Sequence, residues 1–391
     1  MKKLYFILIF AIISMAIGCK KPVETPVDGS KDPVENPSEE PAKPSEDPSA
    51  EPSDEPSEEP SEEPSEEPSE EPSEEPVQYI DLGENGTANC YVVSEAGNYM
   101  FKAVKGNSTT AVEGSAAEVI WAYTIFGGLN SVVSEVLLED GYVKFTATGT
   151  EGNTGIAVKD GSGNILWSWH IWSIKNLPDV TIGSYTVQNY SLGYIDWPAN
   201  DAYSFGMLYQ WGRKDPFPSQ YCTLDGNFPV VGNTDEGVID AEGTAYNYAV
   251  ANPTTFIKGM DAATCDWLAI LQDKQNADAW GGVSGTKSVN DPCPVGYKVP
   301  DSGLYANIAG TDLTVTTDDT HHAVVYKDIT TFLYSGYINY NAGAWEYAGA
   351  WLWDNGVVGA FGSSMYMLGQ YAESAKGWYR GNAMQVRCVK E

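Results

Sequence analysis

The sequence predicts a mainly β protein in which an antiparallel β-sandwich and an α+β domain follow a disordered stalk. Three observations support this fold class. The segment 20–76 contains almost no large apolar side chains, so it cannot form a core. The rest of the chain is rich in glycine and aromatic residues, with 39 glycines and 12% aromatics overall. Its apolar residues alternate with polar ones over short runs, which is typical of strands.

The first residues have the pattern of an export signal. Two lysines precede an apolar run over 4–16, which is shorter than the ~20 residues of a membrane-spanning helix. Ala16-Ile17-Gly18-Cys19 resembles a bacterial lipobox, although Ala16 stands where leucine is more usual. The resemblance implies that residues 1–18 are a lipoprotein signal peptide and that Cys19 is acylated. The alternative is an ordinary signal peptide in which Cys19 has no role.

Residues 19–76 are predicted to be a disordered acidic stalk. From 56 to 76 the sequence repeats Pro-Ser-Glu-Glu, so regular prolines and repelling glutamates favour an extended chain. The stalk carries 21 acidic and 4 basic residues and therefore about half of the net charge of −32. The folded remainder is also acidic, which argues against a nucleic-acid partner. An alternative is an acidic patch that binds cations or basic partners.

Residues 77–177 are predicted to form a small antiparallel, immunoglobulin-like β-sandwich. Asp140-Gly141 and Asp160-Gly161-Ser162-Gly163 are typical hairpin turns. In the closing run 165–172, Trp167, Trp169 and Ile171 would share one face of a strand, with His170 and Trp172 on the other. We interpret Trp167 and Trp169 as core or interface anchors rather than as a ligand platform.

Residues 178–391 are predicted to form an α+β domain dominated by irregular sheet. Glycines and prolines interrupt its strands, including one expected over 185–194. Helical patterns occur over 262–275 and 302–308.

The second domain resembles a known family. Asp291-Pro292-Cys293-Pro294-Val295-Gly296-Tyr297-Lys298-Val299-Pro300, a short helix after it, and the terminal Gln385-Val386-Arg387-Cys388 resemble the major-paralogous (FISUMP) domain of bacteroidal surface lipoproteins. That domain is similar in layout to the C-type-lectin-like fold and belongs to a fimbrillin-associated group. The upstream domain resembles the β-domain that often precedes it.

The resemblance has consequences for the cysteines. In a C-type-lectin-like layout the start of the helix and the last strand meet, which implies a disulfide between Cys293 and Cys388. Cys222 with Cys265 is the second candidate pair, and Cys90 would stay free. The alternative is that all five are reduced, buried thiols.

Aromatic residues are unusually frequent over 332–379, where rings alternate with amides and charged groups. Such groups suit stacking on sugars or anchoring a protein interface, and the alternative is an aromatic core. The candidate ligand-binding residues are Tyr337, Asn339, Tyr340, Trp345, Tyr347, Trp351, Trp353, Asp354, Asn355, Trp378, Tyr379 and Arg380.

Other charged residues give weaker signals. Arg213 and Lys214 are candidates for contacting an acidic ligand, but a salt bridge with Asp215 within the turn is the favoured interpretation. The adjacent His321 and His322 would point to opposite faces of a strand and do not predict a metal site. Val299-Pro300-Asp301 and Trp353-Asp354-Asn355 only partly resemble the calcium motifs of C-type lectins, so no calcium site is predicted.

Recognised catalytic motifs of hydrolases, metalloproteases and nucleotide-binding enzymes are absent from the sequence. We therefore expect no catalysis and no cofactor. The first hypothesis is an outer-membrane-anchored, surface-exposed adhesin or ligand-binding lipoprotein that recognises a glycan or a surface protein. The second is a structural accessory or tip subunit of fimbria-like assemblies, and the third is a glycan-processing enzyme.

Overall fold

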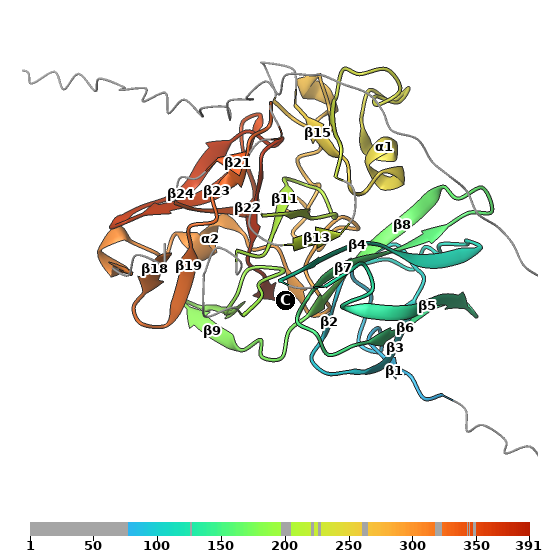
Figure 1. Cartoon of the computed structure of the whole chain (residues 1–391). Coiled ribbons are helices and arrows are strands. Elements are labelled where there is room, and N and C mark those ends of the chain that lie inside the picture. The colour runs from blue at the N-terminus through green and yellow to red at the C-terminus, as the bar shows by residue number, and fades with distance from the viewer. Residues whose placement is uncertain are drawn as a thin grey trace, which may run out of the picture. The chain divides into compact units, whose positions relative to one another are not determined.

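The computed structural model describes residues 77–125, 127–196, 205–219, 223–225, 228–259, 265–316, 323–341, 343, 345–346 and 349–391 (Figure 1). The signal peptide 1–18, Cys19 and the stalk 19–76 lie outside the described residues, so the predictions made for them stay predictions. The described part is mainly β, which confirms the coarse fold class. Its helices are few and short.

The first β part consists of two facing sheets. One contains, in spatial order, β1 (Ile80–Asp81), β3 (Gly97–Lys102), β6 (Tyr142–Ala147) and β5 (Val133–Glu139). The other contains, in spatial order, β13 (Thr223–Asp225), β4 (Ala116–Thr124), β7 (Gly152–Lys159), β8 (Ile165–Ser173) and β2 (Cys90–Val93). Most pairs are antiparallel as predicted, but β1 with β3 and β2 with β8 are parallel. β13 reaches this sheet from beyond residue 178.

The predicted hairpin turns are confirmed. Asp140 and Gly141 both have positive φ, 52° and 77°, between β5 and β6. The turn between β7 and β8 is closed by Asp160, whose Oδ1 accepts hydrogen bonds from the backbone N–H groups of Ser162 and Asn164. Asparagine and aspartate favour such turns because their side chains bond to the backbone locally.

The tryptophan-rich strand β8 separates two cores in the way that its alternation predicts. Trp167, Trp169 and Ile171 pack with residues of both sheets in the interior of the first β part. Trp172 and His170 lie on the opposite face, where the His170 Nδ1 is 3.1 Å from the Tyr209 hydroxyl oxygen. The two faces of one strand therefore serve different cores.

The second part is built around a larger sheet, whose C-terminal strands are seen in red and orange in Figure 1. Its strands, in spatial order, are β12 (Phe217–Pro218), β11 (Met207–Gln210), β25 (Ala383–Val386), β22 (Ala350–Val358), β23 (Phe361–Leu368) and β24 (Tyr371–Trp378). β20 (Tyr337–Ile338) pairs with β25 and with β21 (Trp345–Glu346). β22 and β25 run parallel, and the other pairs are antiparallel.

Smaller sheets surround the large one. The first contains β16 (Tyr297–Lys298), β26 (Val389–Lys390), β10 (Tyr185–Gln188) and β9 (Asp179–Ile182). The second contains β17 (Leu313–Val315), β18 (Ala323–Tyr326) and β19 (Thr330–Leu333), and β14 (Val230–Gly232) pairs with β15 (Phe256–Lys258). The strand expected over 185–194 thus ends at Gln188, and the chain continues as a loop.

The disulfide between Cys293 and Cys388 is present, as the family resemblance implied. It joins residues 95 positions apart and attaches the last strands to the segment before α2 (Ser302–Tyr305). Cys90 is buried and free, as expected. Cys222 lies outside the described residues, so its pairing with Cys265 stays a prediction.

The helices differ from the sequence prediction. The α-helices are α1 (Tyr246–Ala251) and α2 (Ser302–Tyr305), and the 3-10 helices are η2 (Gln272–Lys274) and η3 (Gly310–Asp312). α2 confirms the start of the helix predicted over 302–308 but ends earlier, and α1 was not predicted. The Asp301 side chain caps α2 by accepting a hydrogen bond from the Gly303 N–H.

The helix predicted over 262–275 is wrong for its described residues, 265–275. Cys265 has a φ of 45°, which a right-handed helix does not allow. The Asp266 Oδ1 accepts a hydrogen bond from the Leu268 N–H, and the Trp267 indole donates to the Trp211 carbonyl oxygen. The apolar spacing of this segment therefore reflects anchoring of an irregular loop in the core, not a helical face.

The two parts share a core. Contacts join Ser73–Glu391 into one unit, and one hydrophobic cluster contains Trp121 and Trp172 together with Trp211, Trp353 and the disulfide. The described residues contain no helix long and apolar enough to cross a membrane.

Candidate ligand-binding site

Three of the predicted aromatic ligand-binding residues are buried. Trp353 is 0% exposed, Trp351 4% and Tyr337 9%. The Trp353 indole donates to the Tyr209 carbonyl oxygen at 2.8 Å. These rings fill the core, which was the alternative interpretation of the aromatic-rich segment.

The polar candidates beside these rings have internal partners. The carboxylate of Asp354 accepts hydrogen bonds from the Gly356 N–H and the Ser363 hydroxyl, and burial raises its pKa to about 6. The Asn355 amide donates to the Val299 carbonyl oxygen. Arg380 lies over the Trp211 ring, with Nη1 3.8 Å from the Asp266 carboxylate. The polar groups of this set therefore stabilise loops within the second part.

A partly exposed group of rings remains, which we call the aromatic strip: Tyr340, Tyr366, Tyr371, Trp378 and Tyr379. Trp378 lies 4.8 Å from Trp351, between ring centroids, and Tyr340 lies 4.6 Å from Tyr379. Tyr371 is 52% exposed.

Three further predicted residues give little information on this surface. The Asn339 Oδ1 accepts a hydrogen bond from the Asn341 N–H. The side chain of Trp345 and all of Tyr347 lie outside the described residues. Of the aromatic strip, Tyr340, Trp378 and Tyr379 belong to the predicted set, whereas Tyr366 and Tyr371 were not predicted.

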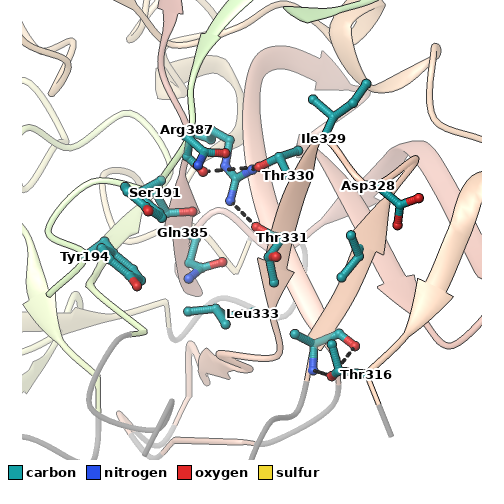
Figure 2. Close-up of a pocket in the computed structure, with 14 residues that line it drawn as sticks. Ser191, Tyr194, Thr316, Asp328, Ile329, Thr330, Thr331, Leu333, Gln385 and Arg387 are labelled. Atoms are coloured by element: carbon teal, nitrogen blue, oxygen red, sulfur yellow. Dashed lines mark hydrogen bonds between the residues drawn. The ribbon is translucent and has the colours of Figure 1, made fainter. Parts of the chain in front are cut away.

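A cavity of about 370 Å³ lies in the second part, between the loop after β10, the sheet of β17–β19 and the end of β25 (Figure 2). This volume is at the lower end of small-molecule sites, which span about 300–1,000 Å³. Exposed Asp328, Ile329 and Thr331 line it, so it opens to solvent. It is lined by Asn189, Tyr190, Ser191, Tyr194, Thr316, Ala323, Val325, Asp328, Ile329, Thr330, Thr331, Leu333, Gln385 and Arg387.

Arg387 carries the positive charge in the cavity wall. It is 2% exposed, its Nη1 donates to the Thr330 hydroxyl at 2.9 Å, and its Nη2 donates to the Thr331 carbonyl oxygen at 2.7 Å. The guanidinium lies over the Phe332 ring at 4.1 Å. Burial lowers the Arg387 pKa to about 10, so the group stays charged at neutral pH.

Several buried polar atoms of this wall have no hydrogen-bond partner among the described residues. They are the Asn189 Oδ1, the Ser191 Oγ, the Gln385 Oε1 and the Arg387 Nε. Buried polar groups are normally paired, and leaving one unpaired costs about 1–3 kcal/mol. Figure 2 shows Ser191, Gln385 and Arg387 on the same side of the cavity, with Tyr194 beside them.

Two tyrosines give the cavity a flat aromatic side. The rings of Tyr190 and Tyr194 are stacked, with centroids 4.0 Å apart and planes inclined by 4°. The cavity therefore combines rings with polar groups, as sugar and small polar-ligand sites do.

Sequence reasoning missed this cavity. Its residues come from three distant segments, around 189–194, 316–333 and 385–387. One signal for it is present in the sequence, the string Gln385-Val386-Arg387-Cys388, which had pointed only to the family resemblance. An arginine between an apolar residue and a buried cysteine is itself unusual, and this would have identified Arg387, which lies between β25 and β26.

Arg213 and Lys214 lie elsewhere, in a closed region of the interior. The Lys214 Nζ is 2.6 Å from the Asp215 carboxylate, which confirms the predicted salt bridge. The Arg213 guanidinium donates to the Gln210 side chain and the Thr255 carbonyl oxygen. Both cations therefore serve internal structure.

The remaining predictions concern metals. His321 and His322 lie outside the described residues. Within the described ranges, no group of three or more His, Cys, Asp or Glu side chains is arranged to hold a metal ion. His170 is buried, with Nε2 2.8 Å from the Asn153 Oδ1, and burial lowers its pKa to about 3.

Comparison with known proteins gave no match: no family model fits the chain, and neither a curated protein nor a solved structure is similar to it. The FISUMP and C-type-lectin-like resemblance therefore stays a prediction from the motifs.

Proposed function

We propose that this chain is a surface lipoprotein that binds a glycan without catalysis, held at the outer membrane by acylated Cys19 and displayed on the acidic stalk. The observation that carries this proposal is the cavity beside Arg387, with its stacked tyrosines and its polar side chains. A glycan would supply hydroxyl groups for the polar groups that face the cavity and an apolar ring face for a tyrosine.

The size of the cavity limits what it would hold. A volume of about 370 Å³ suits one or two sugar residues at a chain end or branch rather than a long segment of polymer. The aromatic strip offers a second, flatter surface. Binding through the cavity would therefore recognise a terminal sugar.

The test is a glycan array probed with the whole chain carrying Cys19→Ser, which keeps it free of lipid. Thr331→Trp places a large ring at an exposed position in the cavity lining and should reduce binding at least tenfold. The matched control, Thr150→Trp, makes the same change at an exposed residue of the first β part that does not line the cavity and should retain binding. Absence of binding to any glycan, or equal binding by both variants, contradicts the proposal.

A second function, as a subunit of fimbria-like assemblies, is favoured by the sheet edge at β24. Exposed apolar side chains occur there and on the neighbouring strands: Val358 is 39% exposed, Leu368 47% and Tyr371 52%. Exposed edge strands promote association with other chains. Co-purification of the native protein with a filament, lost on Tyr371→Asp, would support this function over glycan binding.

A further inference from the structure

We propose that the cavity selects an acidic sugar, with a carboxylate held by the positive charge of Arg387. This inference rests on the proposed glycan-binding function and adds the chemical class of the ligand. It depends on how Arg387 differs from the other buried arginines of the chain.

Of the other two buried arginines, Arg380 lies 3.8 Å from the Asp266 carboxylate. Arg213 has no carboxylate within ion-pair distance among the described residues, but the negative charge of nearby Asp215 acts on it and its guanidinium is held by the Gln210 side chain and backbone carbonyl oxygens. An unpaired Nε is common to all three arginines, so that feature alone does not mark a site. What distinguishes Arg387 is the charge around it.

No carboxylate lies within ion-pair distance of Arg387 among the residues that the structure describes. The titratable groups that act on it are the side chains of Tyr305 and Tyr190, not carboxylates. A buried charge without a counter-ion is unfavourable. A ligand carboxylate would supply the counter-ion that the protein lacks.

The cavity is also the place where such a ligand would enter. Arg387 is 2% exposed and lies in the cavity wall. The acidic residue of the lining is Asp328, which is exposed and lies on the opposite side of the cavity from Arg387 in Figure 2. The charges of the lining are thus separated, with the cation inside and the anion at the rim.

The remaining lining suits the neutral part of a sugar. The stacked Tyr190 and Tyr194 offer an aromatic face, and exposed Thr331 brings a hydroxyl group. An inorganic anion would use the charge but not these groups, so an acidic sugar matches more of the cavity.

The experiment is calorimetric titration of the whole chain with Cys19→Ser. The acidic probes are glucuronic acid, galacturonic acid and N-acetylneuraminic acid, and glucose and galactose are the neutral counterparts of the first two. We expect at least one acid to bind at least tenfold more tightly than the neutral sugars. Raising the salt concentration should reduce that preference only modestly, because buried charges are poorly screened.

Two variants test the role of charge without removing Arg387. Asn189→Asp adds a carboxylate of nearly identical shape to the lining and should weaken binding of the acid at least tenfold, with less than threefold effect on a neutral sugar. Asp328→Asn removes the negative charge of the rim and should tighten binding of the acid about twofold. Gln272→Glu, which makes the same amide-to-acid change on exposed η2, is the control and should not change the affinity.

The possible results separate the two proposals. If acidic and neutral sugars bind equally, or if Asn189→Asp weakens both equally, acid selection is wrong while glycan binding stands. If none of the probes binds and the glycan array is also negative, both proposals fail.

Discussion

Two regions of the second part bury positive charge in different ways. Around Lys214 the cation is enclosed and neutralised, since its Nζ contacts the Asp215 carboxylate and the Ser168 carbonyl oxygen and hydroxyl. Around Arg387 the cation has neutral partners and lies in the wall of a cavity. Lys214 therefore has an internal counter-ion, whereas for Arg387 we propose that a ligand supplies it.

The largest expected effect comes from the disulfide next to Arg387. Replacing Cys293 and Cys388 by alanine opens a loop of 95 residues, which should cost about 4–5 kcal/mol of unfolding free energy in the chain-entropy model. Denaturant titration measures the change. The double variant should lose sugar binding, because Arg387 precedes Cys388 in the chain.

The salt bridge at Lys214 provides the contrast. We expect the Lys214–Asp215 salt bridge to persist in the double cysteine variant under conditions where that variant stays folded. If the regions around Lys214 and Arg387 unfold together, at the same denaturant concentration as in the wild type, the disulfide contributes little to stability.

Removal of the enclosed cation should have the next largest effect. Lys214→Met leaves Asp215, which is 6% exposed, as a buried charge without its counter-ion, at a cost of about 3–5 kcal/mol. Thermal and denaturant unfolding measure it. The double variant Lys214→Met with Asp215→Leu should recover most of the loss, and failure to recover would mean that packing, not charge, dominates there.

The loss of stability at acid pH should come from a third buried group, the imidazole of His170. Its pKa is about 3 in the folded protein, against 6.5 for the unperturbed group. As pH falls below 6.5, the unfolded chain binds a proton that the folded protein excludes, so stability decreases between pH 6.5 and 3. The loss should reach about 2 kcal/mol by pH 5.

Three carboxyl groups oppose this trend. Burial raises the pKa values of Asp266, Asp291 and Asp354, the last two from 3.8 to about 6. The folded protein therefore binds these protons first and gains stability from them as pH falls from 6 to 3.8. The measurement is therefore the difference in unfolding free energy between wild type and His170→Gln at each pH. A difference that does not change with pH would contradict the assignment to His170.

The sequence predicted what depends on neighbours in the chain. The alternation of 165–172, the turn at Asp140-Gly141 and the salt bridge between adjacent Lys214 and Asp215 all follow from local geometry, and all are present. The disulfide required the family resemblance. The predicted helix over 262–275 failed in its described residues because tertiary contacts of Asp266 and Trp267 override the apolar spacing.

The cavity could not be predicted from sequence neighbours either, because tertiary contacts bring its lining residues together. Ser191 and Gln385 are nearly two hundred residues apart in the sequence, and both line it only because the chain returns through β25. Conversely, Trp353 and Asp354 are residue types that suit a binding surface, but both lie in the core. Composition indicates which groups are present, whereas burial decides which of them a ligand reaches.

The smallest expected change in unfolding free energy comes from replacing Arg387, and it distinguishes Arg387 most clearly from Lys214. Arg387→Met removes a buried charge that has no carboxylate partner among the described residues, so the protein loses two hydrogen bonds but also an unfavourable desolvation. Replacing buried ionic groups by apolar ones of similar size is often neutral or stabilising, and we expect a change in unfolding free energy of no more than about 1 kcal/mol. Denaturant titration of this variant beside Lys214→Met provides the matched pair.

The same variant should abolish the preference for acidic over neutral sugars in calorimetry. A destabilisation as large as that of Lys214→Met would mean that Arg387 is held for structure, as Lys214 is. Stability near that of the wild type, together with loss of acid selection, would mean that this charge is buried for the sake of a ligand.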